Sequence, residues 1–128
     1  MPDLPASKRL RIGRYAESSR IYLLTINTRD REPIFKDFSL GRGVVNQFRC
    51  AQDQGFANSL AWVVMPDHFH WLIELRQGSL GGLVQRTKSL STKAVKQSTG
   101  RTTSLWQRGF HDRALRREED LVKMARYV

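Results

Sequence analysis

Apolar and polar positions along the chain follow two periods, one typical of strands and the other of helices. Short runs rich in β-branched and aromatic residues predict strands, and apolar residues three and four positions apart predict helices. In the first half of the chain, the pattern predicts a strand over residues 21–27, a charged loop over 28–33 and a helix over about 43–54. Strands over 59–65 and 69–75 follow, and then a long helix that starts at 78–79. The rest of the chain has strand-like pieces at 104–106 and 110–115 and a last helix that starts at about 118.

The order of these elements predicts the fold class. A β-α-β-β-α-β sequence followed by a helix is typical of a split βαβ, ferredoxin-like α+β fold. The turn at Pro66-Asp67 would join its neighbouring strands as a hairpin, so we expect a largely antiparallel sheet. Helices would cover one face of this sheet and leave the other open to ligands. At 128 residues the chain is expected to form one domain, at 21–128, after a basic arm at 1–20.

Two histidines open the strand predicted over residues 69–75. On a strand, residues two apart point to the same face, so His68 and His70 project together while Phe69, Trp71 and Ile73 point into a core. Two neutral imidazoles on one face can chelate a divalent cation, because each ring offers a lone pair. The alternative is that both histidines are half-exposed polar residues at the end of a sheet.

The charge of the chain predicts a polyanionic partner. Lys and Arg number 22 against 12 acidic residues, which gives a net charge of +10, and 16 of the 22 cations are Arg. Arg suits bidentate contacts to phosphate, so this surplus predicts salt-sensitive binding to nucleic acid. The alternative is a protein that is basic for another reason, such as a location near the ribosome.

Other features of composition restrict the class of protein. The longest apolar run, 60–65, is far too short to cross a membrane, and the N-terminus has no apolar core like that of a signal peptide. The single Cys50 excludes an internal disulfide and a multi-cysteine zinc site. We therefore expect a cytoplasmic protein without a membrane partner.

The last predicted helix carries Tyr127 away from its apolar stripe. Tyr127 lies roughly 110° from the centre of that stripe and shares a side with Asp120 and Lys123. The ring is therefore expected to be presented to a ligand, although a surface tyrosine of an amphipathic helix is the alternative. Next to a histidine-bound cation that polarises a phosphate, a phenolate could attack phosphorus and form a phosphotyrosine ester.

Four segments carry a resemblance to a known family. The chain resembles the HUH single-tyrosine transposases (HUH denotes His-hydrophobic-His) and, within them, the REP-associated tyrosine transposases. The order and spacing of the segments agree from about residue 10 to the end of the sequence. The segments are Gly13-Arg14-Tyr15, Met65-Pro66-Asp67-His68-Phe69-His70-Trp71, Leu105-Trp106-Gln107-Arg108-Gly109-Phe110-His111-Asp112-Arg113 and Ala125-Arg126-Tyr127-Val128.

The resemblance implies a function and assigns roles to residues. It implies that His68 and His70 bind Mg²⁺ or Mn²⁺, and that Tyr127 is the nucleophile. The family cleaves single-stranded DNA near imperfect hairpins, forms a 5′-phosphotyrosine link, leaves a free 3′-hydroxyl and rejoins strands. Residues expected to contact DNA are basic or aromatic, and they lie in the N-terminal arm, on the long helix and near residue 106: Arg9, Arg11, Arg14, Tyr15, Arg86, Lys88, Lys93, Trp106 and Arg108.

The chain departs from the family pattern at its end. The sequence stops one residue after Tyr127, whereas the family continues this helix and takes a further metal ligand from it. Glu74 shares the histidine face but is expected to lie too far away, and Asp112 cannot be placed from sequence. We expect His111 to be structural or to face DNA. With this short last helix, a monomer is favoured over a dimer.

Two other functions fit the sequence. The first is a non-catalytic module that binds structured single-stranded DNA or RNA through a basic sheet face with aromatic residues. The second is a metal-dependent nuclease with a water nucleophile, which would not need Tyr127. Metal dependence and a covalent protein–DNA adduct distinguish these functions from the transposase.

Overall fold

The structure is a computed structural model and describes residues 20–115 together with Lys123 and Arg126. The two single residues are helical and exposed. The predicted basic arm and most of the predicted last helix, including Tyr127, lie outside the described residues. No helix in the described part of the chain combines the length and the apolar content that crossing a bilayer requires.

Four strands form one sheet in the order β2-β3-β1-β4. Every pair of neighbouring strands is antiparallel, and β3 lies between β1 and β2. This is the split βαβ arrangement, so the predicted α+β, ferredoxin-like fold class is confirmed. The strands are β1 (Ile21–Asn27), β2 (Ala57–Met65), β3 (His68–Leu75) and β4 (His111–Leu115).

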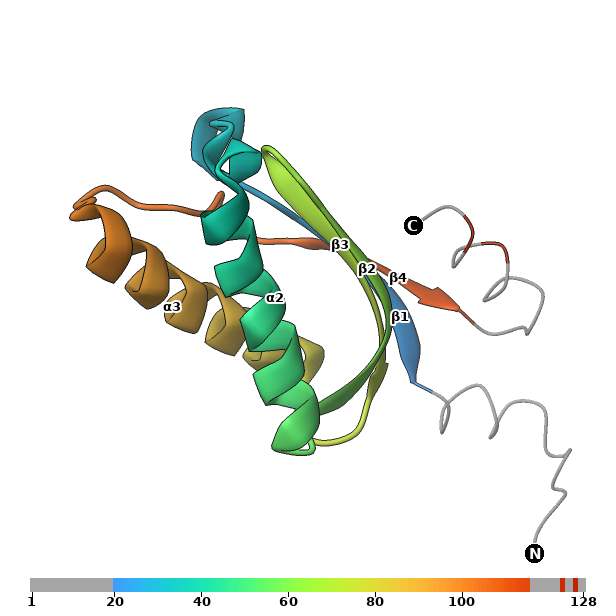
Figure 1. Cartoon of the computed structure of the whole chain (residues 1–128). Coiled ribbons are helices and arrows are strands. Elements are labelled where there is room, and N and C mark those ends of the chain that lie inside the picture. The colour runs from blue at the N-terminus through green and yellow to red at the C-terminus, as the bar shows by residue number, and fades with distance from the viewer. Residues whose placement is uncertain (1–19, 116–122, 124–125, 127–128) are drawn as a thin grey trace, which may run out of the picture.

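Two helices lie on one face of the sheet, and the opposite face carries none among the described elements (Figure 1). They are α2 (Phe38–Asp53) and α3 (Leu80–Thr99). The side chain of Asp37 accepts a hydrogen bond from the Ser39 backbone N–H and caps α2. Helix α2 therefore begins about five residues before the predicted start at 43. Its two early glycines, Gly41 and Gly43, obscured this start, and Gly41 is buried where α2 faces Val64 of β2.

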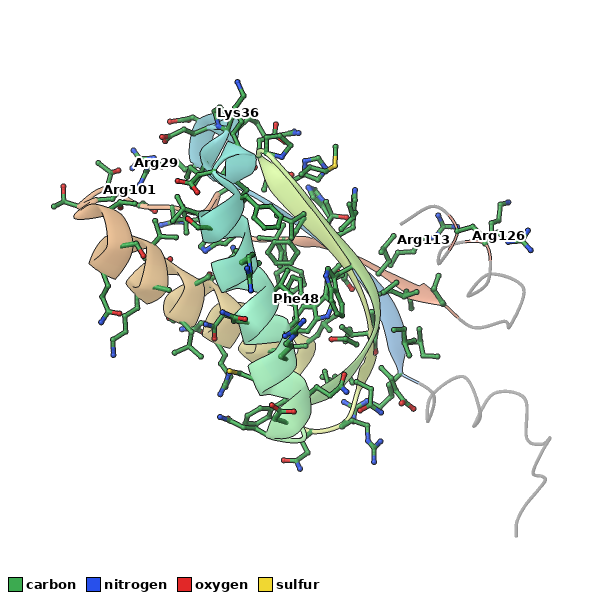
Figure 2. All side chains as sticks on the ribbon, in the orientation of Figure 1. Arg29, Lys36, Phe48, Arg101, Arg113 and Arg126 are labelled. Carbon is green, nitrogen blue, oxygen red and sulfur yellow. The ribbon has the colours of Figure 1, made fainter. Side chains whose placement is uncertain are left out.

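An aromatic cluster fills the space between the helices and the sheet. Phe48 points from α2 towards the sheet (Figure 2), where its ring stacks on Trp71 with a centroid distance of 4.3 Å. Phe48 also meets Phe69 edge-on at 5.0 Å. Phe69, Trp71 and Ile73 are fully buried, as the alternation along this strand predicts. The larger core cluster therefore lies on the helix-covered face, and a smaller one of Leu23, Leu72 and Leu115 lies on the opposite face, where β3 also presents its histidines.

Hydrogen bonds connect the loops at one end of the sheet. The segment predicted as strand-like at 104–106 forms only an isolated bridge, between Thr28 and Trp106. The charged loop after β1 contains two 3-10 helices, η1 (Arg29–Arg31) and η2 (Ile34–Lys36). The Thr28 hydroxyl donates to the backbone carbonyls of Glu32 and Asp67, at 2.8 and 3.1 Å. These bonds fix the loop after β1 to the turn that precedes the histidines.

Candidate metal and nucleic-acid site

The two predicted metal ligands lie side by side at the start of β3. His68 pairs with Asn27 of β1 and His70 pairs with Thr25, so both rings stand on the open face. The centroids of the two imidazoles are 5.0 Å apart, and their planes are nearly perpendicular. Both residues are half-buried. The structure thus brings together the two residues that the spacing predicted, within reach of a ligand on this face.

A carboxylate from the preceding turn orients His68. Nδ1 of His68 lies 2.7 Å from Oδ1 of Asp67, and the other carboxylate oxygen accepts a 3.0 Å hydrogen bond from Nε of Arg31. The hydrogen bond to His68, and then that from Arg31, lower the pKa of the Asp67 carboxyl, so it is charged at neutral pH. Histidine ligands usually donate one ring N–H to such a carboxylate and coordinate through the other nitrogen. Nε2 is therefore the atom through which His68 would bind a metal.

A threonine on the neighbouring strand β1 orients His70 in the way that Asp67 orients His68. Nδ1 of His70 lies 2.9 Å from Oγ1 of Thr25, which can accept its proton. Burial lowers the pKa of His70, and the nearby His68 lowers it further. His70 is therefore neutral at pH 7, and a neutral imidazole is the form that binds a metal. The donor set fits a divalent transition-metal ion, and Mn²⁺ suits nitrogen ligands better than Mg²⁺, which prefers oxygen.

The described residues supply no third ligand beside this pair. Within them, no three His, Cys, Asp or Glu side chains cluster in a way that could hold a metal. Glu74 is on the same face but about 13 Å along β3, where its Oε1 accepts a hydrogen bond from Asn58. His111 is in the same cross-strand row as His70, but β1 separates them by about 10 Å. Asp112 pairs with Leu24, so it faces the helix side of the sheet.

A basic pocket adjoins the histidine pair at the same end of the sheet. The pocket has a volume of about 470 Å³. Arg31, which bonds to Asp67, is one wall, and Arg29 and Arg108 contribute two further guanidinium groups. The backbone N–H of Gln107 donates to the carbonyl of Asn27, which places the loop that carries Arg108 beside the start of β3. The pocket lining thus contains three arginines and one acidic residue, Asp30. This excess of guanidinium groups could bind a phosphate.

Trp106 does not present its ring to a ligand, contrary to the expectation from sequence. It is 7% exposed and lies in the core, where its ring contacts Phe35 and Phe69 with centroid distances of 5.5 Å each. Its Nε1 donates a 3.1 Å hydrogen bond to the hydroxyl of Ser91 on α3. The indole therefore holds α3 to the sheet and is too buried to stack on a base, although Trp106 also lines the basic pocket.

The cations of α3 lie on the helix side of the sheet, away from the histidines. Arg86 hydrogen-bonds to Gln54 and stands over the Phe56 ring, 5.0 Å from its centroid. Lys88 donates to two backbone carbonyls of the loop before β4, those of Gln107 and Gly109, at 2.9 and 2.6 Å. Burial lowers the pKa of this ammonium group. Arg86 and Lys88 therefore brace the fold, whereas Lys93 is exposed and Arg108 is exposed beside the basic pocket.

Five of the predicted site residues lie outside the described residues. They are Arg9, Arg11, Arg14, Tyr15 and Tyr127. Their predicted roles as DNA contacts and as the nucleophile stay predictions.

The sequence reasoning missed the residues that orient the histidines. Asp67 was read only as a turn residue, although its place directly before His68 was a usable signal. Thr25 could not be found without the β1–β3 register, because it comes from a strand 45 residues away. Arg29 and Arg31 were assigned only to a charged loop.

The chain matches the family of IS200-like transposases over residues 17–128. The match covers most of the chain, so the protein belongs to this family. The resemblance to single-tyrosine transposases predicted from the four segments is thereby confirmed. A comparison with curated proteins found no match.

Two solved structures share the fold. One is a REP-associated tyrosine transposase bound to a REP hairpin, with a TM-score of 0.72 and 20% identity over 87% of this chain and 65% of that one. The other is a candidate transposase from Deinococcus radiodurans R1, with a TM-score of 0.64 and 20% identity over 84% of this chain and 86% of that one. The chain thus spans slightly less than two thirds of the length of the first protein.

Proposed function

We propose that the protein is a metal-dependent transposase that cleaves and rejoins single-stranded DNA at hairpins of the REP type. The observation that carries this proposal is the His68–His70 pair on the open face, oriented by Asp67 and Thr25, in a chain of the IS200-like transposase family. The neighbour of known structure bound to a REP hairpin supports the choice of substrate.

In this proposal, the described residues would bind and orient a phosphate. His68 and His70 would hold Mn²⁺ or Mg²⁺ through Nε2, and the bound ion would supply positive charge that polarises the scissile phosphate. Asp67 and Thr25 keep the two rings in place. Arg29, Arg31 and Arg108 would bind a neighbouring phosphate and so hold the DNA backbone in register.

Tyr127 is the proposed nucleophile. Its phenolate oxygen would attack phosphorus, form a 5′-phosphotyrosine ester and release the 3′-hydroxyl of the cleaved strand. Attack by a 3′-hydroxyl on the same phosphorus would reverse the step and regenerate the tyrosine. Neither step needs water as nucleophile or an external energy source.

A denaturing gel tests the proposal. Protein is incubated with end-labelled hairpin-bearing single-stranded DNA and Mn²⁺ or EDTA, beside the Tyr127→Phe variant. A Mn²⁺-dependent covalent band that Tyr127→Phe lacks is the expected result. Cleavage that persists in Tyr127→Phe would instead indicate a nuclease with a water nucleophile. Binding without any adduct would indicate the non-catalytic binding module.

A further inference from the structure

A second groove lies on the other face of the sheet, between α2 and the edge strand β2. It has a volume of about 440 Å³, within the range of about 300–1,000 Å³ that small-molecule sites occupy. This volume has room for a nucleobase. The groove shares no lining residue with the histidine pair or the basic pocket, and its walls include Phe38, Arg42 and Arg49 of α2 and Trp62 of β2.

Exposed aromatic rings stand on both walls of this groove. Phe38, at the start of α2, is 77% exposed, and Trp62, on β2, is 40% exposed. Trp62 packs one part of its ring against Phe48 in the core, with a centroid distance of 5.9 Å. The indole is therefore anchored while it offers surface to the groove. Anchored, exposed rings are the groups on which unpaired bases stack.

Two arginines follow Phe38 along one stripe of α2. Arg42 and Arg49 lie 4 and 11 residues after Phe38, so they share its side of the helix. Neither arginine forms an ion pair with another described residue, and the groove lining contains no acidic side chain. A groove with aromatic rings and unneutralised arginines is complementary to single-stranded nucleic acid.

Only the edge strand β2 lies between the groove and the histidine face. In the β2–β3 register, Met65 pairs with His68 and Trp62 with Trp71. Met65 is 43% exposed beside the histidines, and Trp62 lies three residues along the same strand on the other face. A DNA strand that leaves the histidine pair can therefore cross this edge and enter the groove. A second copy of the chain fits less well, because each copy has a net charge of +10.

We propose that the groove between α2 and β2 binds the single-stranded DNA that flanks the hairpin, with bases stacked on Trp62 and Phe38 and phosphates bound by Arg42 and Arg49. This inference rests on the proposed function. The groove would then select substrates with an unpaired flank, while the histidine face does the chemistry.

The test compares two DNA probes by fluorescence anisotropy at several salt concentrations. One probe is a blunt hairpin, and the other is the same hairpin with a short unpaired flank. Wild type is expected to bind the flanked probe more tightly. The double variant Arg42→Gln/Arg49→Gln should lose this preference, and its salt slope should fall by about 0.7 for each lost phosphate contact. Arg76→Gln/Lys96→Gln removes equal charge from exposed sites outside the groove and should keep the preference.

Variants of Trp62 distinguish a loss of base stacking from a loss of folding. Trp62→Thr should bind the flanked probe about 5- to 150-fold more weakly, while Trp62→Phe keeps a ring and most of the affinity. Trp71 and Trp106 are buried, so the flanked probe should quench the fluorescence of Trp62 alone. Circular dichroism of each variant reports whether it folds.

The outcomes distinguish failure of this inference from failure of the proposed function. Two results would contradict DNA binding in the groove and leave the transposase proposal standing. The first is equal affinity of wild type for both probes. The second is a groove variant that behaves like the charge control. No binding of either probe would overturn both. A dimer in sedimentation that Arg42→Gln/Arg49→Gln dissociates would assign the groove to a second copy of the chain instead.

Discussion

At the start of β3, neighbouring residues face opposite sides of the sheet and differ in burial. Phe69 and Trp71 point towards α2 and α3 and are fully buried, whereas His68 and His70 stand half-buried on the open face. Close-packed aromatic rings cover this end of the strand on one face, and hydrogen bonds hold the polar side chains on the other. A single strand therefore supplies both the core and the candidate metal site, and each can be changed while the other is kept.

The largest expected effect comes from the helix-covered face. Phe69→Ala removes a fully buried ring that contacts Phe48 and Trp106, and should lower the free energy of unfolding by about 3–5 kcal/mol. The adjacent His70→Ala removes a half-buried ring that is hydrogen-bonded to Thr25 and should cost about 0.5–1.5 kcal/mol. Urea unfolding of both variants measures the difference. Equal losses would contradict the division between the two faces.

A buried polar contact should have the next largest effect. Ser91→Ala leaves Nε1 of Trp106 without its acceptor in the core, and should destabilise the fold by about 1–3 kcal/mol. Affinity for hairpin DNA should stay unchanged, because Trp106 belongs to the core. Urea unfolding and a binding titration check the two parts. A specific loss of DNA affinity at unchanged stability would restore Trp106 as a DNA contact.

On the open face, the orientation of His68 should control metal binding. Asp67→Asn replaces a charged acceptor of His68 by an amide, and changes to such partners typically weaken metal affinity by about 10- to 100-fold. Asp112→Asn, an exposed carboxylate on the other side of the sheet, is the matched control. Calorimetric titration with Mn²⁺ measures both. Unchanged affinity in Asp67→Asn would show that the carboxylate does not position the ligand.

The smallest effect concerns the loops at the site end of the sheet. Arg101 donates two hydrogen bonds to the Glu32 carboxylate, at 2.9 and 2.8 Å, and these lower the pKa of Glu32. A lowered folded-state pKa stabilises the fold above the unfolded value and loses that effect as the pH falls through the folded value. Wild type should therefore lose more stability than Arg101→Gln between neutral pH and pH values below the ordinary pKa of 4.5. Identical pH profiles in thermal unfolding would show that the pair contributes nothing.

The sequence predicted most of the fold because its strands are short runs rich in β-branched and aromatic residues, bounded by turn residues. Residues 68–75 and the turn at 66–67 predicted the hairpin, and the order of elements predicted the split βαβ sheet. The start of α2 was predicted too late because Gly41 and Gly43 look like helix breakers. In the structure both glycines lie inside α2.

The candidate site was only partly predictable. The histidine pair follows from local spacing, whereas the contact of Thr25 with His70 depends on a pairing between distant strands. The burial of the Trp106 ring was not predictable, because an aromatic residue in a basic segment suggests either stacking on bases or packing in a core. Its hydrogen bond to Ser91, fixed by tertiary structure, puts it in the core.

The most direct test of the histidine site is Mn²⁺ binding by wild type and by the double variant His68→Ala/His70→Ala, followed by the electron paramagnetic resonance signal of free Mn²⁺. Circular dichroism would confirm that the variant remains folded. The paired orientation of the two rings predicts that wild type removes Mn²⁺ from solution and that the folded double variant does not. Equal uptake by both proteins would contradict the assignment of His68 and His70 as the metal ligands.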